Sequence, residues 1–331
     1  MTGPCPTNRT PATRSQASRS SAKRAPAWWR TELIRLLYQV RLATTAQLGR
    51  LLDIEHTKRV WTVLADLTRT GLVDSVRVQG NGPGSTKAWF LTPAGAQLAE
   101  TAGDVVHRPY RMTQQAATGP AQAHMLAVTE TGCVFVEHAR RRGDECRPTD
   151  WNVEVAHRTR DGAASRRAAD LLISDAVLHY TAVGDGRRRL MTFFLEIDRA
   201  TMSVARLARK VDHYARYYTY TPGTQGPRDP RRTTGKRRNS STAPGWRELY
   251  PVFPKLLIVL TGAPEEALTA RTADLRAWCL GNERLRGLSD QINVGAVALT
   301  ALQQQGPFTP IVHRLLTPEA GSVDVTMREQ P

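Results

Sequence analysis

The centre of the sequence is a short apolar segment that ends in two acids, Met191-Thr-Phe-Phe-Leu-Glu-Ile-Asp-Arg199. Four apolar residues within five positions predict a strand buried in a sheet. Side chains two positions apart on a strand share a face, so Glu196 and Asp198 are expected side by side. Because two carboxylates among apolar residues are costly to bury alone, we expect a metal ion or a basic side chain beside them.

The flanking segments supply candidates for such a site. Upstream, residues 168–174 predict another apolar strand, with Asp170 at its start; downstream, residues 201–218 predict a helix that carries Lys210. Carboxylates are the hard oxygen ligands that Mg²⁺ prefers, and a lysine can orient the attacking water. This order of a strand with Asp, a strand with Glu-x-acid and a helix resembles metal-dependent nuclease cores, and the resemblance implies that Asp170, Glu196 and Asp198 bind the metal and that, together with Lys210, they are the catalytic residues. The alternative is structural, with Asp198 capping the helix and Glu196 paired with an arginine.

Composition narrows the class of protein. The chain has 331 residues, enough for two domains, and 40% of them are hydrophobic. No apolar run approaches the length of a membrane span, and the N-terminus lacks a secretion signal. The cysteines are scattered without a C-x-x-C pair, which excludes a sequence-evident zinc site and fits a reducing compartment. We expect a cytoplasmic protein with no membrane partner.

Positive charge is concentrated in two segments. The net charge is +16; residues 1–30 hold six Lys and Arg and no acid, and residues 221–247 hold seven Lys and Arg and one acid. Residues 1–27 are predicted to be a disordered basic arm and residues 221–247 a disordered basic insert. Such segments suit a polyanion such as DNA and add salt-sensitive affinity without reading sequence.

Residues 28–100 predict a winged helix. A first helix starts near Trp28, a second follows Thr44 as N-cap, and a third runs from His56 to Thr70. Strands at 72–79 and 87–91 flank a glycine-rich turn. This order resembles the winged-helix domains of bacterial regulators and mobile-element proteins, in which the third helix enters the major groove of double-stranded DNA. The predicted DNA-contacting residues are Lys58, Arg59, Thr62, Arg69, Arg77 and Lys87.

Residues 101–120 are predicted to be a linker, residues 121–316 an α/β domain, and residues 317–331 a tail. The order of helix, three strands, helix, strand, helix and strand resembles the restriction-endonuclease-like core. That resemblance implies an Asp from the second strand, a Glu-x-Lys pair from the third, and often a Glu from the first helix, here Glu130 or Glu137. Asp198 stands in the lysine position, which leaves three alternatives: Lys210 or Arg206 replaces that cation, Asp198 is one more metal ligand, or the domain binds without catalysis.

Taken whole, the chain is similar to the replication-relaxation family of actinobacterial plasmids and integrative elements. The similarity rests on the winged helix, on Ala169-Asp-Leu-Leu-Ile173, and on Phe194-Leu-Glu-Ile-Asp-Arg-Ala-Thr201 followed by Lys210 and Tyr214. It implies a DNA-binding protein of a mobile element that acts in plasmid replication and in DNA relaxation or transfer, with other replication or transfer proteins as partners.

Two other functions stay open. The acids favour a Mg²⁺-dependent endonuclease that nicks DNA with Asp170, Glu196 and Asp198. A transcriptional regulator, with a C-terminal domain that senses a ligand or partner, is the other alternative; it would act as a homodimer because helix-turn-helix regulators usually read paired half-sites.

Overall fold

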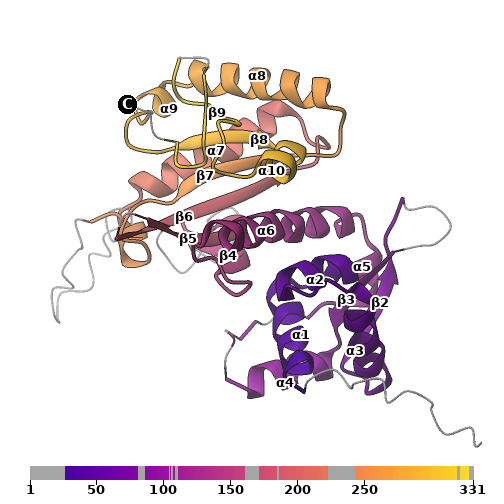
Figure 1. Ribbon diagram of the computed structural model, residues 1–331. Helices are drawn as coiled ribbons and strands as arrows, with labels where there is room; N and C mark the ends of the chain where they lie inside the picture. Colours follow the sequence, from indigo (N-terminus) through magenta and orange to yellow (C-terminus); the bar gives the residue numbers. More distant parts are fainter. Residues whose placement is uncertain are drawn as a thin grey trace, which may run out of the picture.

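A computed structural model describes residues 27–80, 86–103, 105, 107–108, 111–160, 171–184, 186–222, 243–318 and 321–327. It contains an N-terminal winged helix and a domain built on a mixed sheet (Figure 1). The α+β fold class predicted from the sequence is thus confirmed. Residues 1–26 of the predicted basic arm and residues 223–242 of the predicted insert lie outside the described residues.

The winged helix contains four helices and a small sheet in which the strand order is β1-β3-β2, both pairs antiparallel. The turn between β2 and β3, residues 81–85, lies outside the described residues. In chain order the elements are α1 (Ala27–Val40), β1 (Ala43–Thr44), α2 (Thr45–Leu52), α3 (Thr57–Arg69), β2 (Val73–Arg77), β3 (Lys87–Leu91) and α4 (Pro93–Thr101).

Local signals place the two central helices of this unit. The Thr44 side chain accepts a hydrogen bond from the Gln47 backbone while the Gln47 side chain accepts one from the Thr44 backbone, which forms a capping box at the start of α2. After α3, Gly71 takes a φ of +73°, a left-handed conformation that a residue with a Cβ rarely adopts. The apolar stripe of α3, including Val60 and Leu64, is buried, which leaves its other face to solvent.

The second domain carries a seven-stranded sheet in the order β10-β9-β8-β7-β6-β5-β4. Strands β4, β5 and β6 are antiparallel neighbours, β6, β7 and β8 are parallel, and β8, β9 and β10 are antiparallel. Its strands are β4 (Trp151–Arg158), β5 (Leu171–Gly184), β6 (Arg187–Asp198), β7 (Lys255–Leu260), β8 (Val294–Ala298), β9 (Val312–Arg314) and β10 (Ser322–Val323). Strand β10 lies within the predicted tail, where Val325 and Met327 are buried.

Helices cover both faces of this sheet. Helix α6 lies on one face, with α7 and α8 on the other (Figure 1). Successive side chains of β6 point to opposite faces of the sheet and so contribute to both cores. Phe193, Leu195 and Ile197 belong to the core beside α6, whereas Phe194 belongs to the core beside α7. The helices of this domain are α6 (Gln122–Arg142), α7 (Val204–Thr219), the 3₁₀ turn η2 (Gly245–Glu248), α8 (Glu265–Gly281), α9 (Glu283–Arg286) and α10 (Leu299–Gln305).

The two units share one hydrophobic core. Buried residues of α1, α2 and α3 form a single cluster with those of α6 and β4. The buried Thr129 hydroxyl donates to the Leu42 carbonyl oxygen at 2.9 Å, across the boundary between the units. Within residues 101–120, predicted as a linker, Gln114–Thr118 form helix α5, which contacts β2. None of the described helices has both the length and the apolar character that crossing a membrane requires.

Candidate functional site

The exposed face of α3 carries three of the predicted DNA-contacting residues. Lys58, Arg59 and Thr62 are exposed, and neither Lys58 nor Arg59 forms an ion pair with another described residue. Beside them Trp61, which was not among the predicted DNA-contacting residues, is 50% exposed. Position 61 falls between buried Val60 and Val63, a spacing that predicts a solvent-facing tryptophan.

The other three predicted DNA contacts differ from one another. Arg69 pairs with Asp66 on its own helix, which neutralises part of its charge. Arg77 and Lys87 are register partners at the turn end of the β2–β3 hairpin, and both are exposed. The Lys87 ammonium lies 5.5 Å from the centre of the Trp89 ring, a cation–π contact. The two hairpin cations therefore flank the wing on the same side of the sheet.

The second domain brings acids together across two antiparallel strands. Because Ala176 pairs with Leu195, the register places Asp175 beside Glu196. The Ile197 backbone N–H donates to Asp175 Oδ2 at 2.7 Å, which ties the acid of β5 to β6. Asp175 and Glu196 are thus neighbouring carboxylates; Asp170 lies outside the described residues.

Protein donors already meet these carboxylates. Lys210 Nζ lies 2.5 Å from Glu196 Oε2, and the Tyr214 hydroxyl donates to Glu196 Oε1 at 2.5 Å. Both donors come from α7, one turn apart on one helix face. His124 Nε2, on α6, lies 3.3 Å from Asp175 Oδ1. The structure therefore brings together Glu196 and Lys210, both predicted site residues. It adds Tyr214 of α7, which binds Glu196, and His124 of α6, which binds Asp175.

Burial and mutual repulsion set the protonation of this acid pair. Desolvation first, and then the charge of Asp175, raise the pKa of Glu196 to about 7. Burial alone would raise the pKa of Asp175, but the hydrogen bond from His124 and the charge of Lys210 lower it on balance. The hydrogen bond to Asp175 in turn raises the pKa of His124. Two adjacent carboxylates with pKa values displaced in opposite directions are a feature of sites that hold a proton.

Asp198 lies on the same face of β6 but has a different partner. Its side chain is fully buried and pairs with Arg271 of α8, which also donates to the Met202 carbonyl oxygen at 2.6 Å. Its second oxygen, Oδ1, has no hydrogen-bond donor among the described residues. The alternative that Asp198 caps the next helix is wrong, because Ser203 caps α7 and accepts from the Arg206 backbone.

The helix acids predicted as further members of the site lie elsewhere. Arg50 of α2 binds Glu137 through two nitrogens, at 2.8 and 2.7 Å, and its third nitrogen lies 2.5 Å from Glu130. Gln47 also donates to Glu130, at 3.1 Å. Bidentate arginine pairs fix geometry as well as charge. These two acids of α6 therefore hold the winged helix against the sheet domain, and a catalytic role for Glu130 or Glu137 stays a prediction.

Asp175 could have been found from the sequence. The segment Gly184-Asp-Gly186 is typical of a turn, and the structure pairs Gly184 with Arg187 across it. Counting outward from that pair places residue 175, not 170, opposite Glu196.

The donor set argues against a resident Mg²⁺. The four oxygens of Asp175 and Glu196 each accept a hydrogen bond from a protein group, as given above. Among the described residues, no group of three or more His, Cys, Asp or Glu is arranged to hold a metal ion. These residues do not fit a Mg²⁺ centre unless Lys210 or His124 moves away, and the metal set Asp170, Glu196 and Asp198 stays a prediction.

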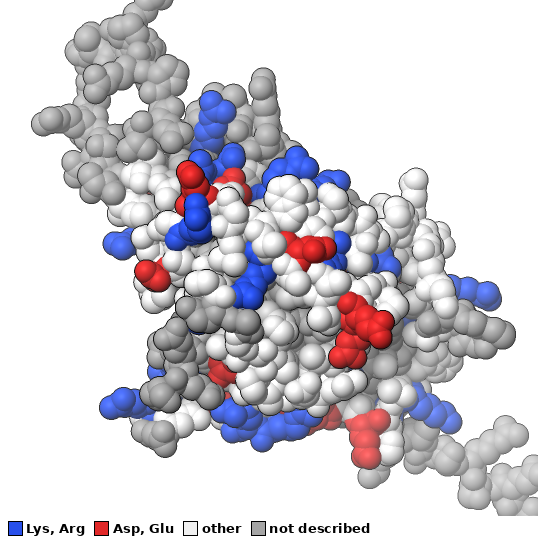
Figure 2. All heavy atoms as spheres, turned by 90° about the horizontal axis from the view of Figure 1, so that it is seen from above, with Lys and Arg blue, Asp and Glu red and all other residues white. Residues whose placement is uncertain are grey.

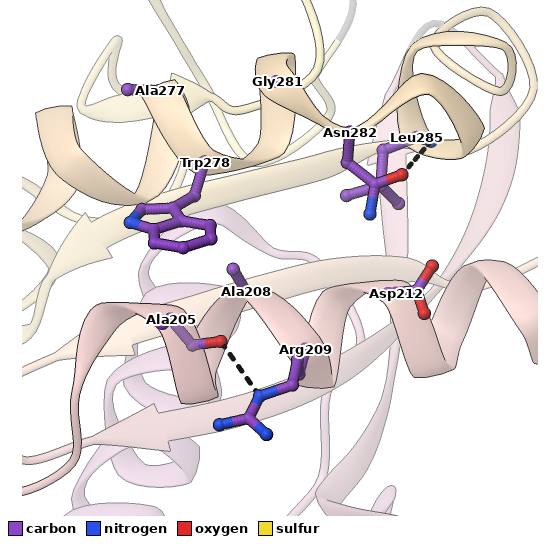
Figure 3. A pocket seen from close by; sticks show the side chains of 9 residues that line it. All are labelled: Ala205, Ala208, Arg209, Asp212, Ala277, Trp278, Gly281, Asn282 and Leu285. Atoms are coloured by element: carbon purple, nitrogen blue, oxygen red, sulfur yellow. Dashed lines mark hydrogen bonds between the residues drawn. The ribbon is translucent and has the colours of Figure 1, made fainter.

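An open groove of about 810 Å³ lies between α7 and α8 (Figure 3). The Trp278 ring, 56% exposed, lies over Ala208 of α7, and Arg209 reaches out beside it. Asp212 closes the other end, paired with Arg216 at 2.8 Å. Seen from the α8 side, basic and acidic side chains lie in separate small groups on a largely uncharged face (Figure 2). That distribution differs from the continuous positive surface that a duplex phosphate backbone requires.

Comparisons with known proteins complete the description. No curated protein matches the sequence. Among solved structures, two mutants of ZitR from Lactococcus lactis are similar to part of the chain. The first, in apo form, has 21% sequence identity, covers 23% of this chain and 55% of that chain, and has a TM-score of 0.21. The second has 22% sequence identity, covers 27% of this chain and 56% of that chain, and has a TM-score of 0.21. The chain thus spans little more than half the length of those chains. The model of the replication-relaxation family matches residues 34–229, from α1 through α7, which is more than half of the sequence, and the chain therefore belongs to the replication-relaxation family.

Proposed function

We propose that the protein binds double-stranded DNA by placing α3 in the major groove, as the DNA-binding protein of a mobile element that acts in plasmid replication, relaxation or transfer. The observation that carries this proposal is the exposed face of α3, where Lys58 and Arg59 have no acidic partner among the described residues. A helix that packs through one apolar stripe and leaves cations unpaired on the other face can approach phosphates and base edges together.

Electrostatics of the hairpin support the same orientation. Arg77 and Lys87 lie at the end of the sheet from which the wing emerges, where a wing reaches the backbone or the minor groove beside the recognition helix. Asp66 is the acid on α3, and Arg30 and Arg69 both pair with it, so its charge is compensated within the domain. The helix therefore presents net positive charge to DNA at its N-terminal half.

The test is quantitative binding to duplexes selected from a random-sequence pool. Lys58→Ala and Arg59→Ala are each expected to weaken binding about tenfold and to reduce the salt slope by about 1, the loss of one phosphate contact. Arg286→Ala is the matched control, since it removes the same charge from an exposed position on α9. Equal affinity and equal salt slope in all four proteins would refute the assignment of α3 as the DNA-reading helix.

A second candidate, an endonuclease that nicks DNA, has one observation in its favour. Lys210 reaches the buried pair of Glu196 and Asp175 from the helix that follows β6, the position to which the sequence reasoning assigned a displaced catalytic cation. Supercoiled plasmid incubated with Mg²⁺ decides between the candidates. If wild type converts it to the open circle and Asp175→Asn and Glu196→Gln do not, the nuclease is supported; identical products from all three proteins, or none, would reject it.

A further inference from the structure

A cavity of about 360 Å³ opens at the amino ends of the parallel strands β6, β7 and β8. Arg189 of β6 and Lys255, the first residue of β7, lie on its wall, and Arg247 of η2 adds a third cation. Glu196 and Asp198 are at the other end of β6, where the strand finishes. The cavity is thus separate from the acid pair, from the α7–α8 groove and from the DNA-reading face of α3.

The charged lining of this cavity is entirely cationic. Its three charged residues are Arg189, Arg247 and Lys255, and the remaining polar groups are amides and hydroxyls, among them Asn293 and Thr192. Arg189 and Arg247 are exposed, and neither forms an ion pair with another described residue. A concave surface that combines several cations with neutral donors and no acid matches the oxygens of a phosphate or phosphodiester.

Aromatic rings form the floor and fix its shape. The Trp246 indole N–H donates to the Tyr218 carbonyl oxygen at 3.1 Å, and the two rings stack with an interplanar angle of 16°. Phe253 contacts both rings edge-on. The Arg247 guanidinium lies 5.3 Å from the Trp246 ring centre, so a cation–π contact holds it over the floor. The site is therefore built before any ligand arrives.

The rim distinguishes one nucleic acid from another. Leu190 and Val252 line the cavity and are 55% and 73% exposed. In a duplex the bases are stacked inside and phosphates are presented on a convex surface, whereas a single strand offers bases and phosphates together. Exposed apolar side chains beside the exposed Arg189 and Arg247 complement the second arrangement. A volume of about 360 Å³ is also within the range of pockets that enclose small ligands.

We propose that this cavity binds one or two nucleotides of single-stranded DNA, with Arg189, Arg247 and Lys255 on the phosphates and the apolar rim on the bases. The protein then has two separate nucleic-acid sites, one for a duplex at α3 and one for an unpaired strand at the amino ends of β6 and β7. This goes beyond the proposed duplex binding and does not depend on it.

The experiment measures binding of a fluorescent oligothymidine to the full chain by anisotropy across a salt series. Arg189→Gln with Arg247→Gln is expected to weaken binding about tenfold and to reduce the salt slope by about 1.4, since each single-strand phosphate contact contributes about 0.7. Arg209→Gln with Arg286→Gln is the control, because it removes two exposed charges elsewhere and keeps both basic segments of the sequence. The control is expected to bind like wild type.

A duplex arm separates this inference from the proposed function. The selected duplex is expected to bind the Arg189 and Arg247 double variant as tightly as wild type, and to bind Lys58→Ala more weakly. Oligothymidine binding that is equal in the double variant and its control, or undetectable in wild type, overturns the single-strand site. A double variant that loses duplex and oligothymidine affinity to the same extent also overturns it, because the cavity would then belong to the duplex interface.

Discussion

Replacing Glu196 with glutamine is expected to change how stability depends on pH. Burial and the charge of Asp175 raise the pKa of Glu196 from 4.5 to about 7 in the folded protein. The folded state therefore binds this proton more tightly than the unfolded state between those two values. The stability that Glu196 contributes is fully present below about pH 4.5 and is lost as the pH rises to about 7. Glutamine has nearly the same shape and cannot ionise, so Glu196→Gln lacks this loss.

The size of the effect follows from the shift. One pKa unit corresponds to 1.36 kcal/mol, so the difference in unfolding free energy between variant and wild type is expected to grow by about 3 kcal/mol from pH 4.5 to pH 8. Urea titrations at several pH values measure it, with m held common to both proteins at each pH. His124 and Asp175 titrate in both proteins, and the charge of Glu196 acts on both of them, so the difference measures Glu196 together with this coupling.

Glu55→Gln provides the control, because Glu55 is exposed and forms no ion pair with a described residue. Its stability curve is expected to run parallel to that of wild type. Parallel curves for Glu196→Gln and wild type would refute the reasoning, since they would show that the acid ionises as easily in the folded chain as in the unfolded one.

Three further substitutions test the packing around the site by urea titration or by the melting temperature. Arg50→Ala is expected to lower the free energy of unfolding by about 2 kcal/mol, because both acids that it binds are left half-buried without their partner; no change would show that the pairs are not maintained in solution. Arg271→Met is expected to cost about 3 kcal/mol, since the fully buried Asp198 loses its cation, and Asp198→Asn in the same chain should restore part of it. Gly132→Ala places a Cβ 2.3 Å from the Trp151 ring, and a melting temperature several degrees lower is expected; an unchanged value would mean that α6 does not pack against β4 this closely.

The sequence predicts those parts of the fold whose signals are local. The helix-turn-helix follows from the cap at Thr44 and the glycine after α3, and these are properties of a few adjacent residues. The sequence also predicts that a basic residue of the next helix lies near Glu196. An acid on a buried strand requires a cation, and the helix that follows carries basic residues. Lys210 is the residue that contacts Glu196. In both cases the group that needs a partner, a helix end or a buried acid, and the residue that provides it lie within about twenty positions of each other in the sequence.

Contacts that depend on how the units dock are not readable in the same way. Glu130 and Glu137 have the position and chemistry of catalytic helix acids. The sequence alone does not show that Arg50, far upstream, forms ion pairs with both of them. The partner of Asp198, Arg271, is likewise distant in sequence, on α8, which follows β6 only after α7, η2 and β7. Arginine is abundant in this chain, so the type of partner was predictable while its position was not.

The shared core limits how the function can be divided between the units. Arg41, at the end of α1, pairs with Glu154, and the β4–β5 register places Glu154 opposite Asp175. Gln39 donates to Asn152 Oδ1 at 2.8 Å along the same boundary. The winged helix therefore packs against the sheet domain next to its acid pair. It is not a DNA-binding domain that is joined to the rest only by a flexible linker. Removing residues 28–100 would expose that core and disturb the acid pair together with the DNA-reading helix, so a lost activity in such a truncation would not identify the unit responsible. Single substitutions on α3 and beside Glu196 leave the shared core intact, and only they can assign each activity to its own residues.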